Sequence, residues 1–407
     1  MNTTRTSRPI LPLATLGLLG GGQLGRMTAL AARSAGYRVH ALDPDPQCAI
    51  RPVVENCITA RWDDAQAAAA LAQSCDVVTL EIEKVSVASL VAAAQYAPVR
   101  PGPEVLDLVQ NRLRQKNWLV RQGFPVGAYT SVRSSAELTS VAESLGHCFV
   151  KVAEGGYDGR GQTRLGSALD AVKAWEYLGG LESVAEQAID LEYEISVLVA
   201  RRPNGEIVVY PPALNHHENQ ILVWSVLPAP IPQERTTEAQ TIARSIAAEI
   251  GLEGVLVVEM FMTRQGKLLV NELAPRPHNS YHASERACVT GQFEQLVRAI
   301  CDLPLGSAEI VRPAAIVNLL GDLWTGAGPL NLTAALRIPE VRLHLYDKSV
   351  ARPGRKMGHI SATGLTPQQA LEQAMTAKRS LHFQTEETGE ETTSTNIPEQ
   401  ITGGTHR

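Results

Sequence analysis

The spacing of the strand-like segments changes partway along the chain, and this change limits the possible folds. Up to about residue 83 the runs "ATLGLLG", "YRVHALDPD" and "CDVVTLEIE" alternate with helical segments, as in a parallel α/β domain. Beyond about residue 180 the runs "SVAEQAI", "EYEISVLVA", "GEIVVYPP" and "QILVWSVLPA" follow one another too closely for crossover helices. The sequence therefore predicts a parallel α/β domain followed by an antiparallel sheet.

The length of 407 residues suits two or three domains. We expect an N-terminal α/β domain over 13–112, a small α/β domain over 113–190 and a larger domain over 191–382 that ends in a small β subdomain. The segment "LDLVQNRLRQKNWLVRQG" reads as one helix that ends near Gly123. The last residues, 383–407, are polar and nearly free of apolar side chains, so we expect them to be a disordered tail.

Composition excludes several classes of protein. The net charge is -5, with 37 basic and 42 acidic residues, and no block of lysine and arginine indicates nucleic-acid binding. The N-terminal apolar run is too short to cross a membrane and leads into a glycine turn. The 6 cysteines have no C-x-x-C spacing, which indicates neither a zinc site nor a disulfide framework. We therefore expect a cytoplasmic protein without nucleic-acid or membrane partners.

A first glycine turn lies between a predicted strand and a predicted helix. In "LLGGGQLGRM", Gly20, Gly22 and Gly25 have G-x-G-x-x-G spacing, and Asp43 ends the next strand. The pattern fits a dinucleotide site, a site for another anionic substrate, or a purely structural turn. We favour an anionic substrate, and the turn alone leaves all three interpretations open.

Two acidic residues lie on a predicted hairpin, "GVLVVEMFMTRQGKLLVNELAPRP". A two-residue turn at Gln265-Gly266 would pair Arg264 with Lys267 and place Glu259 opposite Glu272. Like charges at about 5 Å in an apolar setting require a cation, and Mg²⁺ prefers such oxygen ligands. Asn271, next to Glu272, would assist. The alternatives are that the glutamates face solvent or pair with basic residues, or that the register differs by one residue.

A second glycine-rich segment, "FVKVAEGGYDGRGQ", follows an apolar strand that carries Lys151. It lacks the G-K-[ST] ending of a P-loop and does not lead directly into a helix. We interpret it as a mobile lid whose glycines allow bending and offer backbone N–H groups to phosphates. These glycines are Gly155, Gly156, Gly159 and Gly161.

Together, these motifs resemble the ATP-grasp carboxylate–amine ligases and, within them, the N5-carboxyaminoimidazole ribonucleotide synthetases. The resemblance extends from residue 16 to 360 and includes "VVTLEIEKV", "EYEISVLVAR", "VNELAPRPHNS", "QFEQLVRAI", "VNLLG" and "YDKSVARPGRKMGHI". It implies the ATP-grasp fold, an α/β and α+β arrangement in which a small central lid domain and a C-terminal antiparallel domain enclose ATP.

The implied reaction is the ATP- and bicarbonate-dependent carboxylation of 5-aminoimidazole ribonucleotide, through carboxyphosphate, in purine biosynthesis. The resemblance also implies a homodimer that uses ATP and Mg²⁺, with Mn²⁺ as the alternative metal, and no NAD, zinc or biotin. Other interpretations are a different ATP-grasp enzyme, such as a formate-using transformylase or a biotin carboxylase-like protein, a nicotinamide-dependent dehydrogenase, and a non-catalytic nucleotide-binding regulator.

The resemblance also implies roles for individual residues. Lys151 would contact the α/β-phosphates, Glu186 the adenine and Glu194 the ribose, and His217 would lie near the phosphates, with His216 as the alternative. The implied ATP-binding residues are Arg112, Lys151, Gly156, Tyr157, Asp158, Gly159, Arg160, Gly161, Gln162, Glu186, Gln187, Ala188, Ile189, Glu194, His217, Asn271 and Glu272. The implied metal ligands are Glu259 and Glu272.

The second substrate would bind beside the nucleotide. Its implied contacts are Gly22, Gln23, Leu24, Glu81, Glu83, Arg276, His278, Asn279, Lys348 and Arg355. Tyr157, Asp158 and Arg160 would lie where bicarbonate meets the amine, with Asp158 as a candidate proton acceptor. One departure from the family pattern is Tyr281, which stands where a glycine is expected. We expect this aromatic residue to narrow the substrate pocket.

Overall fold

The computed structural model describes residues 8–156, 161–325, 330–348 and 350–381. The expected tail lies outside these residues, as do Tyr157, Asp158, Gly159 and Arg160 of the glycine-rich segment. No helix in the described part of the chain is long and apolar enough to span a membrane. All cysteines are free thiols.

The N-terminal domain contains a parallel sheet of four strands in the order β3-β2-β1-β4. Its strands are β1 (Thr15–Leu19), β2 (Arg38–Asp43), β3 (Asn56–Thr59) and β4 (Val77–Leu80). The helices between and after them are α1 (Gln23–Ser34), α2 (Ala65–Gln73) and α3 (Val87–Ala93). The strand–helix alternation expected from the sequence is confirmed.

The prediction of a single helix that ends near residue 123 is wrong. The structure has two helices, α4 (Pro103–Gln110) and α5 (Arg112–Arg121), separated at Asn111. Asn111 has an extended backbone, and its side chain caps the N-terminus of α5. At the break, the backbone N–H of Arg112 donates to the carbonyl of Ala153 at 2.8 Å. The interruption therefore ties α5 to the end of the strand that carries Lys151.

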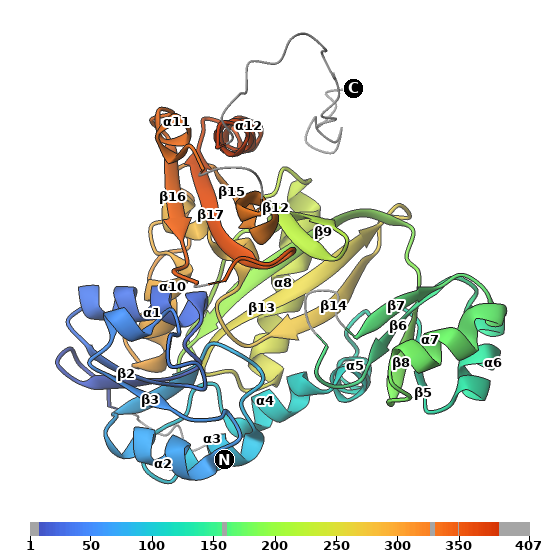
Figure 1. Cartoon of the computed structure of the whole chain (residues 1–407), viewed down its shortest axis with the longest axis horizontal. Helices are drawn as coiled ribbons and strands as arrows, with labels where there is room; N and C mark the ends of the chain where they lie inside the picture. The colour runs from blue at the N-terminus through green and yellow to red at the C-terminus, as the bar shows by residue number, and fades with distance from the viewer. Residues whose placement is uncertain (1–7, 157–160, 326–329, 349, 382–407) are drawn as a thin grey trace.

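A small four-stranded antiparallel sheet follows, in the order β5-β8-β6-β7. Its strands are β5 (Tyr129–Val132), β6 (Cys148–Val152), β7 (Gln162–Leu165) and β8 (Ser183–Gln187), and its helices are α6 (Ser135–Leu145) and α7 (Ala171–Tyr177). Apolar residues from both helices and the sheet form a separate core, which includes Leu138, Val150 and Ala174. Figure 1 shows this sheet and the N-terminal domain on either side of β13 and β14.

The largest element is a nine-stranded sheet in the order β14-β13-β9-β11-β12-β15-β17-β16, with β10 paired to β9. Every pairing in it is antiparallel, as expected. The strands are β9 (Leu191–Arg201), β10 (Ile207–Val209), β11 (Ala213–Glu218), β12 (Ile221–Leu227), β13 (Gly254–Thr263), β14 (Leu268–Ala274), β15 (Ala314–Leu320), β16 (Val341–Leu345) and β17 (Lys356–Thr363). The accompanying helices are α8 (Gln233–Glu249), α9 (Ser284–Ala287), α10 (Gln292–Ile300), α11 (Leu332–Leu336) and α12 (Pro367–Arg379).

A shared core joins the N-terminal domain to the large sheet. One buried cluster contains Leu16 of β1, Ala29 of α1, Leu296 of α10 and Val257 of β13. Helix α10 lies between α1 and the large sheet and contacts both. Burying these side chains at about 25 cal/mol per Å² holds the two domains together, so that residues from both can contribute to one site.

The hairpin of β13 and β14 places Glu259 opposite Glu272, as predicted, but by a different route. The expected two-residue turn is wrong, because Thr263 and Lys267 close a three-residue connection in which Gly266 has φ +76°. A bulge at Asn271 then adds one residue to β14 and restores the register of the two glutamates.

Candidate functional site

Lys151 and Glu186 project from neighbouring strands of the small sheet. Lys151 lies on β6 opposite Val184 of β8, so Glu186 is its diagonal neighbour on the same face. The Lys151 Nζ atom is 3.1 Å from Oε2 of Glu186. Burial by itself would raise the pKa of Glu186, but Lys151 and then Lys116 outweigh it, so the pKa is lowered. Glu186 is therefore a carboxylate held between two cations.

Lys116 was missed by the sequence analysis. Its Nζ lies 3.5 Å from Oε1 of Glu186 and 3.4 Å from the carbonyl oxygen of Asn271, and its side chain is only 5% exposed. Burial lowers the pKa of Lys116, and Glu186 opposes this shift. The sequence feature that could have identified Lys116 is its position four residues after Arg112, which places both side chains on the same face of α5.

A small cavity, with a volume of about 10 Å³, marks where these groups converge. It is lined by five predicted ATP-binding residues and by two further residues of α5: Arg112, Lys151, Glu186, Asn271 and Glu272, with Gln115 and Lys116. Gln115 accepts a hydrogen bond from the N–H of Leu273 at 3.1 Å, which fixes α5 against β14. The cavity therefore joins the small sheet, α5 and the large sheet.

The described ends of the glycine-rich segment also contact this region. Arg112 donates from Nη2 to the carbonyl of Gly156 at 2.8 Å. Gly161 has φ +70°, and a Cβ there would lie 2.7 Å from Cγ2 of Val152, so only glycine fits. Gln162 lies opposite Lys151 in the β6–β7 ladder.

The predicted adenine-binding segment, Gln187 to Ile189, connects β8 to β9. The N–H of Gln187 donates to the carbonyl of Ala128 at 2.9 Å, and the N–H of Ala188 donates to the carbonyl of His147 at 2.9 Å. These hydrogen bonds hold the β8–β9 connection, which joins the small sheet to the large sheet, in place next to Glu186. An adenine contact here stays a prediction.

Glu259 and Glu272 form the candidate metal site. Burial, and then the charge of Glu272, raises the pKa of Glu259 from 4.5 to about 7. No group of three or more His, Cys, Asp and Glu residues in the described chain could hold a metal by itself. Two carboxylates next to Asn271 do fit Mg²⁺, which typically takes its remaining ligands from phosphate and water.

Glu194 and His217 meet one strand further into the large sheet. Oε2 of Glu194 on β9 is 2.6 Å from Nδ1 of His217 on β11. Burial alone would lower the pKa of His217, but Glu194 outweighs it, so the pKa is raised. The neighbouring His216 instead stacks on Trp224, with ring centroids 5.0 Å apart. The geometry therefore favours His217 over His216 as the site histidine.

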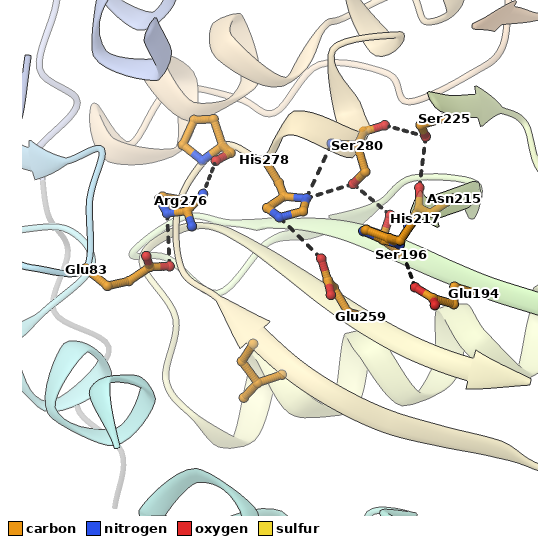
Figure 2. A network of polar contacts seen from close by, with 12 residues as sticks. Glu83, Glu194, Ser196, Asn215, His217, Ser225, Glu259, Arg276, His278 and Ser280 are labelled. Carbon is orange, nitrogen blue, oxygen red and sulfur yellow. Dashed lines mark hydrogen bonds and ion pairs between the residues drawn. The ribbon is translucent and has the colours of Figure 1, made fainter. Parts of the chain in front are cut away.

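His278 lies between the candidate metal site and the segment expected to bind the second substrate. Its Nε2 atom is 3.3 Å from Oε1 of Glu259, and its Nδ1 atom is 2.8 Å from Oγ of Ser280 (Figure 2). Burial, and then Arg276, lowers the pKa of His278 well below its usual value. The amide of Asn279 is buried and has no hydrogen-bond partner among the described residues, which suits a polar ligand.

Arg276 and Glu83 connect the N-terminal domain to the large sheet. The Nε atom of Arg276 is 2.9 Å from Oε1 of Glu83, which follows β4 (Figure 2). The C-terminal β16–β17 connection also reaches the N-terminal domain, because Asp347 lies 3.7 Å from Arg26 of α1. Within that connection, Lys348 donates to the carbonyl of Lys356 at 2.7 Å. The predicted contact Arg355 follows on the same connection and donates to one of its backbone carbonyls.

The first glycine turn is bonded to the protein's own carboxylates. Glu81 accepts hydrogen bonds from the N–H groups of Gly22 and Gly25, at 2.7 and 2.8 Å. Asp43 accepts from the N–H of Gly21 at 2.7 Å. These amides therefore have partners within the chain, and the geometry around them matches a structural turn. Gln23 and Leu24 follow at the start of α1, and their contact with substrate stays a prediction.

The expected narrowing of the substrate pocket by Tyr281 is wrong. The side chain is fully buried, and its hydroxyl lies 2.9 Å from the carbonyl of Ser196 and 2.8 Å from that of Pro211. Its ring packs edge-on against Tyr210, with centroids 6.0 Å apart. The aromatic residue therefore anchors the loop to the core beneath it.

Three family models match successive parts of this chain. Residues 13–110 match the ribonucleotide synthetase preATP-grasp domain, 117–293 the ATP-grasp domain, and 314–373 the phosphoribosylaminoimidazole carboxylase C-terminal domain. The N5-carboxyaminoimidazole ribonucleotide synthase of Bacillus subtilis is 38% identical over 86% of this chain and 92% of its own length.

Solved structures agree with these matches. An ADP complex of an N5-carboxyaminoimidazole ribonucleotide synthetase has a TM-score of 0.87 and 40% identity, covering 92% of this chain and 98% of its own. The Aspergillus clavatus synthase in complex with ADP and 5-aminoimidazole ribonucleotide has a TM-score of 0.83 and 32% identity, covering 90% of this chain and 98% of its own.

Proposed function

The chain belongs to the N5-carboxyaminoimidazole ribonucleotide synthase family and has its ATP-grasp fold, and we propose that it catalyses the reaction of that family. It is an ATP-dependent carbon–nitrogen ligase that carboxylates 5-aminoimidazole ribonucleotide with bicarbonate, releasing ADP and phosphate, in purine biosynthesis. The observation that carries the proposal is the convergence of Lys151, Glu186 and Glu272 on one cavity, with Glu259 paired to Glu272.

ATP binds between the small sheet and the large sheet in this proposal. Lys151 and Arg112 attract the phosphates, and Glu186, together with the β8–β9 connection, binds the adenine. Glu194 accepts hydrogen bonds from the ribose hydroxyls. Lys151 is paired with Glu186, so phosphate must compete for this lysine.

Glu259 and Glu272 hold Mg²⁺, or Mn²⁺ as the alternative, with Asn271 beside them. The metal, when bound, supplies positive charge that offsets the negative charge on the phosphates. The protein's own contribution is a pair of carboxylates held in register by the bulge in β14. Lys151 stabilises the charge that develops as bicarbonate attacks the γ-phosphate.

The second substrate occupies the space between the N-terminal domain and the large sheet. The cationic groups Arg276, Lys348 and Arg355 bind its phosphate and ribose. The amide of Asn279, which has no hydrogen-bond partner in the described part of the chain, contributes a further polar contact. Glu83, which holds Arg276 from the N-terminal domain, contacts the imidazole or ribose. The substrate thereby bridges the same two domains that this ion pair bridges.

The glycine-rich segment covers the reacting groups in this proposal. Carboxyphosphate hydrolyses readily, so water must be excluded while its carboxyl group passes to the amine. Tyr157, Asp158 and Arg160 act at that meeting point, with Asp158 as the proton acceptor. We also propose that the enzyme is a cytoplasmic homodimer with no nucleic-acid or membrane partner.

A coupled ADP-release assay, with each substrate omitted in turn, tests the proposal. We expect release to require both bicarbonate and 5-aminoimidazole ribonucleotide, and Glu272→Gln to lower it at least about 100-fold. Formate-dependent turnover without bicarbonate would instead indicate a transformylase. Full activity of Glu272→Gln would contradict the metal site.

A further inference from the structure

A chain of buried polar side chains runs beneath His278 through the large sheet. We call Asn215 of β11, Ser196 of β9 and Ser280 the polar relay. All of them are at most 6% exposed. The Nδ2 atom of Asn215 is 3.0 Å from Oγ of Ser196, which is 2.8 Å from Oγ of Ser280. Figure 2 shows the relay leading from the sheet to His278, and His278 facing Glu259.

The donors and acceptors of the relay can be followed in one direction. The Asn215 amide donates to Ser196, so the hydroxyl proton of Ser196 is directed to Ser280. The hydroxyl of Ser280 then donates to Nδ1 of His278 at 2.8 Å. The backbone N–H of Ser280, which can only donate, also faces Nδ1 at 3.4 Å. Nδ1 is therefore an acceptor, and the ring proton is on Nε2.

The opposite direction is electrostatically unfavourable. Rotating the Asn215 amide by 180° would reverse each hydroxyl and place the ring proton on Nδ1. Nε2 of His278 would then present a lone pair to the carboxylate of Glu259 at 3.3 Å. The backbone N–H of Ser280, which cannot accept a hydrogen bond, faces Nδ1 and therefore selects the direction in which Nδ1 accepts and Nε2 donates.

We propose that the polar relay holds His278 in its Nε2–H tautomer, so that His278 donates a hydrogen bond to Glu259 and orients its carboxylate. The relay residues are positioning residues, because they act on Glu259 only through His278. Glu259 has two oxygens, so a hydrogen bond from His278 to Oε1 leaves Oε2 available to a metal ion. The part of this inference that concerns metal binding rests on the function proposed above.

Ser225 of β12 supports the same loop from beneath. Its hydroxyl is 2.8 Å from the carbonyl of Ser280 and 2.9 Å from Oδ1 of Asn215. The loop is thus bonded directly to β9 through Ser196 and to β12 through Ser225, and Asn215 of β11 bonds to both of these serines. Such outer contacts typically change metal affinity or activity about 10- to 100-fold when they are removed.

Long-range ¹H–¹⁵N correlation spectra of the full chain, labelled with ¹⁵N-histidine, test the tautomer directly. The protein has 10 histidines, so the signals of His278 are identified by their loss in His278→Gln. We expect an unprotonated Nδ1 and a protonated Nε2 in the wild-type protein. A wild-type spectrum with the proton on Nδ1 would overturn the inference, and this measurement requires neither metal nor turnover.

Mn²⁺ binding to the ADP complex, measured by titration calorimetry, tests the consequence. We expect Ser280→Ala to weaken Mn²⁺ binding about tenfold, and Ser196→Thr, which keeps the hydroxyl, to retain the affinity. The matched control is Ser361→Ala in β17, because this buried hydroxyl has no hydrogen-bond partner among the described residues. The control variant should bind Mn²⁺ as the wild type does.

The outcomes separate this inference from the proposed function. If Ser280→Ala keeps both the tautomer and the wild-type Mn²⁺ affinity, while Glu259→Gln loses the metal, the relay has no positioning role and only this inference fails. If Glu259→Gln itself binds Mn²⁺ normally, the metal role of Glu259 fails, and the consequence drawn here for metal binding fails with it.

Discussion

Replacing Glu259 by glutamine should make the metal-free protein more stable and the enzyme inactive. Burial and the opposing Glu272 raise the pKa of Glu259 from 4.5 to about 7. A carboxyl group with a raised pKa favours folding below its unfolded pKa, and this contribution is lost as the pH rises through the folded pKa. The loss therefore falls between pH 4.5 and about 7.

The magnitude follows from the size of the shift. At about 1.4 kcal/mol per pKa unit, a rise from 4.5 to about 7 corresponds to about 3 kcal/mol above pH 7. Near pH 5.5 only about 1 kcal/mol has been lost. Glutamine has almost the same shape and carries no charge, so Glu259→Gln should gain up to about 3 kcal/mol at pH 8 and about 1 kcal/mol at pH 5.5.

Denaturant unfolding in the presence of a chelator, at both pH values, measures the difference in unfolding free energy. The matched control is Glu249→Gln, an exposed position at the end of α8, which should change little at either pH. The same preparation of Glu259→Gln should release ADP at least about 100-fold more slowly than the wild type. A variant whose advantage does not grow with pH would refute the reasoning.

Three further substitutions test separate contacts. Lys116→Met removes one of the two lysines that pair with Glu186. It should lower the free energy of unfolding, measured with denaturant, by about 2 kcal/mol, and it should raise the KM for ATP. Glu194→Gln should lower the pKa of His217, measured by NMR titration. In the wild type the raised pKa of His217 stabilises the fold at low pH, and this stabilisation is lost as the pH rises through that pKa. The variant should therefore lose stability mainly below about pH 6.5. Tyr281→Phe removes the hydroxyl that bonds to the core carbonyls and should cost about 1 kcal/mol in denaturant unfolding. The KM for 5-aminoimidazole ribonucleotide should not change, since a changed KM would indicate that the hydroxyl contacts the substrate.

In the β13–β14 hairpin, the sequence predicted the correct pair of residues from an incorrect turn. The sequence predicted Glu259 opposite Glu272 through a two-residue turn, whereas the structure has three residues in the turn and a bulge at Asn271. Each difference shifts the register by one residue, and the two shifts cancel. Without the bulge, the three-residue turn would place Asn271 opposite Glu259, so the pairing of the two glutamates depends on the bulge as well as on the turn.

Contacts between segments that are far apart in the sequence could not be predicted, for a different reason. Lys116 and Glu186 lie 70 positions apart and meet only because the helix breaks at Asn111, where the side chain caps the second helix. The spacing of apolar residues along the sequence does not reveal such a break. The burial of Tyr281 likewise depends on the carbonyls of β9 and the adjoining loop, which the local sequence does not show.

The sequence by itself determined the alternation of strands and helices, the antiparallel sheet and the lysine on the strand before the glycine-rich segment. These features depend on residue types at short, regular spacings, which local backbone geometry converts into structure. Only the tertiary structure decided that Glu81 binds the turn of Gly22, that Lys116 shares Glu186, and that a buried polar relay reaches His278. Those contacts depend on which strands are neighbours and which faces meet, and that order is set by packing over the whole chain.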